Sequence, residues 1–113
     1  MNAADHRRAA GELQDTRTRL VLPNDLRTYV EVTFGAAQQY VAAGLLERHG
    51  VHHDTHAGMP RDLRRLGYAQ IALAFEELTQ LRTGRWYGRQ GDGTAATECD
   101  RLLEIIRRWT ESR

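Results

Sequence analysis

Residues 68–89, YAQIALAFEELTQLRTGRWYGR, decide the fold class of this chain. Their apolar side chains recur at intervals of three and four residues, which is typical of a helix with one buried face: Tyr68, Ile71, Phe75 and Leu78. The same spacing then continues through Arg82, Arg85 and Arg89. We therefore expect a long helix over 68–87. Its buried face is apolar at the start and carries a row of guanidinium groups towards the end.

This arginine row has two interpretations. Guanidinium groups are planar, permanently charged and suited to bidentate recognition of phosphate or carboxylate. Three of them beside a packed face suggest an anion site between helices. Alternatively, Arg85 and Arg89 lie beyond the end of the bundle and are solvated. The sequence leaves both interpretations open.

The composition is that of a soluble globular domain. The chain has 113 residues, 41% of them apolar and 27% charged, and we expect one domain over 1–113. All 16 basic residues are arginine, yet the formal net charge is only +1. A protein-wide basic field for nucleic acid is therefore excluded, and any phosphate-binding surface must be local.

The single cysteine and the hydropathy pattern indicate the compartment. Cys99 cannot form an intramolecular disulfide, and it lies on an apolar helical face, so we interpret it as a core residue. No apolar run approaches the roughly 18 residues that cross a bilayer, and the N-terminal residues lack an apolar signal core. We expect a cytoplasmic protein with no membrane contact.

The whole chain predicts an all-α fold, because no run alternates apolar and polar residues as a strand does. Proline and glycine separate the helical segments, with Pro23, Gly50 and Gly67 as breaks and Thr94 as an N-cap. We expect an antiparallel bundle of four main helices and one short helix. The predicted segments are 3–21, 25–49, 60–66, 68–87 and 95–111.

Small residues are dense in the second segment. Its buried positions follow a spacing of four and three, and alanine and glycine at 35–37 and 42–44 allow a neighbouring helix to approach closely. This suits either a tight bundle or a dimer face. The buried positions are Leu26, Val30, Thr33, Ala37, Tyr40 and Gly44.

Histidines cluster after Gly50. Imidazoles and a carboxylate can bind zinc or nickel, but Gly50 interrupts the helix and no second group of metal-ligating residues exists. We therefore expect a surface loop and no metal site or cofactor. The residues concerned are His49, His52, His53, Asp54 and His56.

Arg82 lies where the helical spacing predicts at least partial burial, so it needs an anionic partner. Candidates are Glu76 or Glu77 of a neighbouring subunit, Glu31 in the second segment, or a phosphate ligand. Gly84 and Gly88 lower helix propensity and allow a bend that brings Tyr87 towards Arg82. Trp86 would stack on a base or cover the end of the bundle.

The order of short motifs resembles the HEPN superfamily, small all-α prokaryotic domains that often accompany a minimal nucleotidyltransferase. The resemblance covers about residues 25–110. The matching elements are Leu45, Leu46 and Gly50, then Thr55, His56 and Gly58, then Arg82, Tyr87 and Gly88.

The resemblance implies a homodimer with the Arg82 motif of each subunit facing the dimer cleft. Ribonuclease members carry an arginine followed four to six residues later by a histidine that transfers protons. Here position 87 is tyrosine, and an ordinary tyrosine, with a pKa near 10, is a poor base at neutral pH. In members that pair with a nucleotidyltransferase, a tyrosine in this motif region can receive the nucleotidyl group, and Tyr87 aligns best with that role.

Three hypotheses follow. The favoured one is a dimeric, non-catalytic module that binds nucleotide or RNA, or is the partner subunit of a nucleotidyltransferase in a toxin–antitoxin system. Arg82 and Tyr87 would then line the cleft, supported by Arg85, Trp86 and Arg89. The second is a metal-independent endoribonuclease toxin that uses Arg82 with Tyr87 or His56. The third is a structural bundle whose arginines make only salt bridges.

Overall fold

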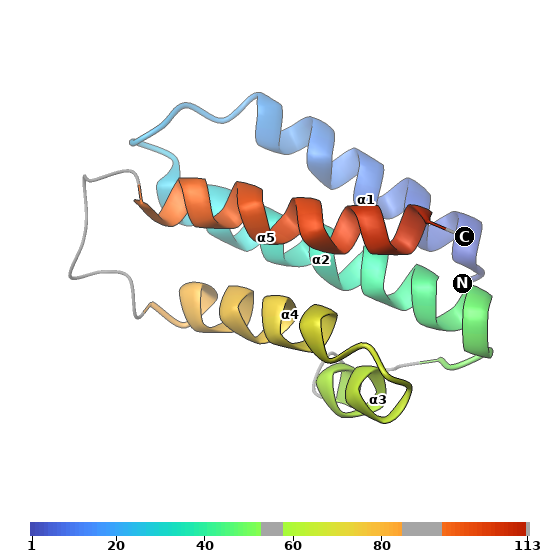
Figure 1. The fold of residues 1–113 in the computed structure, drawn as a ribbon. Helices are drawn as coiled ribbons and strands as arrows, with labels where there is room; N and C mark the ends of the chain where they lie inside the picture. Colours follow the sequence, from blue (N-terminus) through green and yellow to red (C-terminus); the bar gives the residue numbers. More distant parts are fainter. Residues whose placement is uncertain (53–57, 85–93, 113) are drawn as a thin grey trace.

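The computed structural model describes residues 1–52, 58–84 and 94–112, and all regular secondary structure in these ranges is helical. The helices pack into an antiparallel bundle in which the short α3 folds back beside the start of α4 (Figure 1). The predicted all-α bundle is confirmed. The helices are α1 (Ala3–Thr18), α2 (Leu26–His49), α3 (Met59–Arg65), α4 (Ala69–Arg82) and α5 (Thr94–Glu111).

Helix α2 lies at the centre of the bundle and packs against α1, α4 and α5. Every residue from 40 to 45 is buried, because neighbouring helices cover α2 on more than one side. Its predicted buried positions are confirmed, with Leu26 half-buried at the start. The alanines of the segment and Gly44 are buried within the chain itself, which fits the tight bundle, whereas Gly35 is half-buried.

Helix α4 buries the predicted apolar face: Phe75 and Leu78 are fully enclosed, and Tyr68 just before the helix is half-buried. However, the predicted extent to residue 87 is wrong, because α4 ends at Arg82. The next residues turn back on the helix. Thr83 N–H donates to Thr79 O at 3.0 Å, Gly84 N–H donates to Leu81 O at 3.1 Å, and Gly84 adopts a φ of 92°. Only glycine takes that left-handed conformation without strain.

Other boundaries agree to within a few residues. Gly50 ends α2 in a left-handed conformation with a φ of 66°, as its position predicts. Helix α1 stops at Thr18 instead of residue 21. Helix α5 begins at Thr94, one residue before its predicted start.

Helix α1 has only one fully buried residue, Ala10, so apolar burial alone attaches it weakly to the bundle. Polar bonds supply further contacts. Arg7 makes two bonds to the Glu47 carboxylate, at 2.9 and 2.8 Å, and a third to the Thr110 carbonyl at 3.2 Å. His6 Nδ1 lies 2.7 Å from Gln39 Oε1. These contacts join α1 to both α2 and the end of α5.

Two glycine substitutions test how closely α5 approaches α2. A Cβ at Gly44 would lie 2.5 Å from two ring carbons of Trp109, whereas a Cβ at Gly11 of α1 would have nothing within 4 Å. We expect Gly44→Ala to lower the free energy of unfolding by about 1–3 kcal/mol through overpacking. Gly11→Ala should raise it by up to about 1 kcal/mol through helix propensity. Urea unfolding measures both, and equal stability of the two variants would contradict the packing.

Candidate functional site

Arg82, the last residue of α4, is anchored to α2. Its Nε donates a hydrogen bond to Glu31 Oε2 at 3.0 Å, and its guanidinium carbon lies over the Phe34 ring, 4.7 Å from the centroid. Glu31 and Phe34 share one face of α2 because they are three residues apart. Phe34 in turn packs against Phe75, with ring centroids 5.3 Å apart. The aromatic core thus supports one side of the guanidinium.

The Nη1 and Nη2 atoms of Arg82 take no part in the hydrogen bond to Glu31. Within the part of the chain that the structure describes, its side chain donates only the bond from Nε. The side chain is 38% exposed and that of Glu31 is 49% exposed. An ion pair this exposed contributes only about 0–1 kcal/mol to stability. Arg82 Nη1 and Nη2 therefore make no hydrogen bond within the described residues, and the ion pair through Nε contributes little to the stability of the fold.

Of the partners predicted for Arg82, Glu31 is the one that the structure brings to it. Glu76 forms two short bonds with Arg64, at 2.7 and 2.6 Å, which lower the pKa of that carboxyl. Glu77 accepts a longer bond of 3.4 Å from Arg101. Both carboxylates thus have basic partners within their own chain.

The remaining predicted site residues lie outside the described ranges. These are His56, Arg85, Trp86, Tyr87 and Arg89. The same holds for His53 and Asp54 of the histidine group. Arg82 is consequently the one member of the predicted cleft whose contacts are described.

His49 joins an aromatic cluster at the opposite end of α2. Its Nε2 lies 2.9 Å from Tyr68 Oη, and Tyr68 packs edge-on against Trp109, with ring centroids 5.1 Å apart. Arg48 covers the Trp109 ring at 4.8 Å and donates to the Trp109 and Ser112 carbonyls at the end of α5. In the described residues, no group of three histidine, cysteine or acidic side chains is placed to hold a metal ion. The cluster joins α2, α4 and α5.

Sequence reasoning missed a second arginine site, at Arg17 of α1. Arg17 is 11% exposed, and its nitrogens donate to Thr33 Oγ1 at 2.8 Å, Gln14 Oε1 at 2.6 Å and Tyr29 Oη at 3.0 Å. Nη2 also pairs with Asp100 of α5. The available signal was its spacing, because Arg17 continues the apolar face of Ala10 and Leu13. Its partners could not be predicted, since they come from three helices.

The Arg17 site perturbs two neighbouring groups. Burial, together with a hydrogen bond donated by the Tyr29 hydroxyl to Asp100, raises the pKa of Tyr29 to about 12. Burial raises the pKa of the Cys99 thiol to about 11, although a hydrogen bond with Thr33 and the charge of Arg17 oppose the shift. Cys99 is fully buried, which confirms its place in the core. Both groups stay protonated at neutral pH, so neither is an activated nucleophile.

Comparison with models of known protein families, with curated proteins and with solved structures yields no match. No helix in the described ranges combines the length and apolar character that crossing a bilayer requires.

The Arg17 site predicts a pH effect at the alkaline end. Because the pKa of Tyr29 is raised in the folded state, its contribution to stability is complete below pH about 10 and is lost as the pH rises through about 12. Ultraviolet titration of phenolate, taken as the difference between the wild type and Tyr29→Phe, should show a midpoint near 12. In denaturant the same difference should titrate near 10. A folded midpoint near 10 would refute the hydrogen bond between Tyr29 and Asp100.

Proposed function

We propose that this protein is a cytoplasmic, dimeric, non-catalytic helical module that binds RNA or nucleotides through Arg82. The supporting observation is the state of the Arg82 guanidinium. It is positioned by Glu31 and Phe34, half open to solvent, and makes no hydrogen bond through Nη1 or Nη2 within the described residues. A guanidinium in this state loses little conformational freedom when it binds a phosphate oxygen pair.

The charge balance favours a phosphate-bearing polymer or nucleotide over a single small anion. Glu31 offsets part of the Arg82 charge, so one phosphate at Arg82 alone would bind weakly. The sequence places Arg85, Trp86, Tyr87 and Arg89 directly after Arg82. We propose that these residues contact further phosphates and stack on a base, which adds affinity along an extended ligand.

The absence of a histidine after Arg82 in the sequence supports a non-catalytic role. Charge stabilisation by an arginine speeds phosphodiester cleavage only if another group moves the proton from the ribose hydroxyl. Tyrosine at position 87 is instead suited to accept a nucleotidyl group. We therefore include a separate nucleotidyltransferase among the proposed partners, in a toxin–antitoxin-type system.

RNA binding should depend on Arg82 and on salt. Fluorescence anisotropy with labelled single-stranded RNA should show affinity falling with salt, because phosphate neutralisation releases counterions. Arg82→Ala should weaken binding by about fivefold or more and reduce the salt slope by roughly one contact. Arg8→Ala is the matched control: Arg8 is an exposed helical arginine paired with one carboxylate, Asp5. Equal loss in both variants would show non-specific attraction.

The endoribonuclease alternative is tested by incubating RNA with the protein in EDTA. We expect no cleavage by the wild type or by Arg82→Ala. Cleavage by the wild type that Arg82→Ala abolishes would make the protein a metal-independent ribonuclease. It would then direct attention to Tyr87 and His56 as the proton-transferring group. Cleavage that both proteins share would indicate a contaminant.

A further inference from the structure

Two arginines of the described residues have no anionic partner there. The side chains of Arg19 and Arg27 are exposed and make neither a hydrogen bond nor an ion pair within the ranges that the structure describes. Every other arginine in these ranges pairs with a carboxylate or, in Arg48, with backbone carbonyls. Arg19 follows α1 and Arg27 lies in the first turn of α2. Both therefore lie at the end of the bundle where α4 reaches Arg82 (Figure 1).

Arg27 lies on the same side of α2 as the Arg82 site. It precedes Glu31 by four residues, and residues at this spacing are neighbours on a helix surface, with about 5–6 Å between their Cβ atoms. Glu31 in turn accepts the bond from Arg82 Nε at 3.0 Å. Glu31 thus has two arginines as neighbours, Arg82 from α4 and Arg27 one helical turn back along α2.

Arg27 is not placed to stabilise the fold. The amino end of a helix carries a partial positive charge, so a cation in the first turn is unfavourable. The first turn of α2 has no acidic residue that would offset this, and the Asp25 carboxylate just before the helix accepts a hydrogen bond from Val21 N–H at 2.7 Å. Glu31 is bonded to Arg82. The guanidinium of Arg27 is therefore available to an anion of a ligand.

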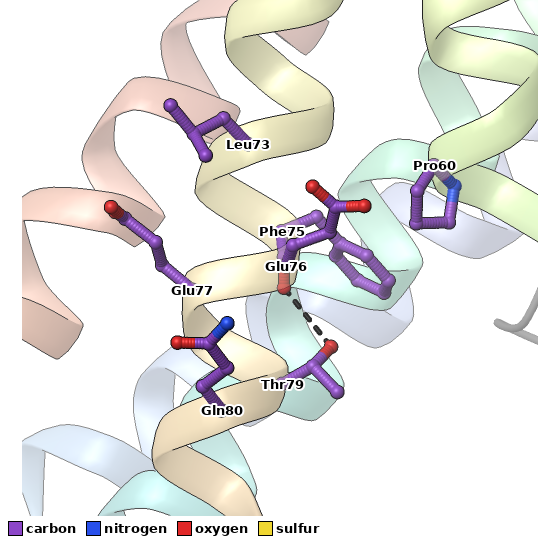
Figure 2. Close-up of a pocket in the computed structure, with 7 residues that line it drawn as sticks. All are labelled: Pro60, Leu73, Phe75, Glu76, Glu77, Thr79 and Gln80. Atoms are coloured by element: carbon purple, nitrogen blue, oxygen red, sulfur yellow. Dashed lines mark hydrogen bonds between the residues drawn. The ribbon is translucent and has the colours of Figure 1, made fainter.

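A polyanion bound at Arg82 could continue in two directions, and one of them is acidic. The outer side of α4 carries an open groove of about 590 Å³ beside α3, which Figure 2 shows. Among the described residues, its lining includes Glu76, Glu77 and the 53% exposed Leu73, but no basic side chain. Carboxylates repel phosphates, so this groove is unsuited to them. The other direction crosses the start of α2, where Arg27 lies.

We propose that Arg27 contacts a second phosphate of the RNA bound at Arg82, so that the strand crosses the start of α2. The inference rests on the proposed function and adds a residue and a direction to the same site. Because Glu31 neighbours both arginines and its carboxylate only accepts hydrogen bonds, it repels a single phosphate placed to bridge them. The ligand is then an oligonucleotide that places separate phosphates at the two arginines, and not a nucleoside monophosphate.

Fluorescence anisotropy with a labelled oligoadenylate of about eight nucleotides tests the second contact. Arg27→Ala should weaken binding by about fivefold and lower the salt slope by roughly one contact. Arg19→Ala is the matched control and should leave the affinity unchanged. Arg19 is also exposed and unpaired within the described residues, but it follows α1, which lies on the opposite side of α2 from α4 (Figure 1). The losses in Arg27→Ala and Arg82→Ala should multiply in the double variant, since the two residues contact different phosphates.

Urea unfolding separates a ligand contact from a structural role of Arg27. Arg27→Ala should unfold at the same urea concentration as the wild type or at a slightly higher one, because it removes a cation from the amino end of α2. Arg27→Lys keeps the charge and should keep the salt slope of the wild type. Marked destabilisation of Arg27→Ala would assign Arg27 a structural role and overturn the inference.

The binding results also distinguish the inference from the proposed function. Loss of affinity in Arg82→Ala without any loss in Arg27→Ala would overturn the inference alone. Equal losses in Arg27→Ala and Arg19→Ala would do the same, because they would show general attraction to this end of the bundle. A wild type that does not bind the oligonucleotide, or that binds it no better than Arg82→Ala does, would overturn both.

Discussion

The close approach of α5 to α2 at Gly44 is the contact on which the rest of the bundle depends. The Trp109 ring occupies the space that any side chain at position 44 would need. With α5 seated there, the buried Thr110 hydroxyl donates to the Tyr40 carbonyl at 2.8 Å. The end of α5 is then close enough for Arg7 and Arg48 to bond its carbonyls. Because position 44 is glycine, α5 can lie this close to α2, and α1 can bond the end of α5 through Arg7.

The two arginines that face α2 illustrate how a structural guanidinium differs from an available one. Arg17 is nearly buried and donates from all three nitrogens to side chains of its own chain, so it joins α1, α2 and α5 and leaves no nitrogen unbonded. Arg82 is held by a single nitrogen and an aromatic face. Both have carboxylate partners, so the presence of a salt bridge does not separate the roles. The two arginines differ in how many guanidinium nitrogens make no hydrogen bond within the described residues: none in Arg17, and Nη1 and Nη2 in Arg82.

Helix α4 consequently carries two features on different parts of its surface. Its inner face and its last residue lie against α2, where Phe34 supports Arg82. Its outer face carries Leu73 and the groove beside α3. Because the helix is only 14 residues long, these features are close along the chain, yet they lie on different sides of it.

Local patterns in the sequence determined the fold class, the buried faces of α2 and α4, the core position of Cys99 and the stop at Gly50, because each depends on spacing or on the backbone freedom of one glycine. Glu31 was one of several partners that the sequence allowed for Arg82, and only the packing of α4 on α2 selected it. The end of α4 at Arg82 was missed, because the helical spacing continues past Gly84 through Arg85 and Arg89, while Gly84 turns the chain. The Arg17 network and the exposure of Leu73 also depended on tertiary structure. Both arise from how separate helices pack, and helical periodicity carries no information about which helix covers a given face.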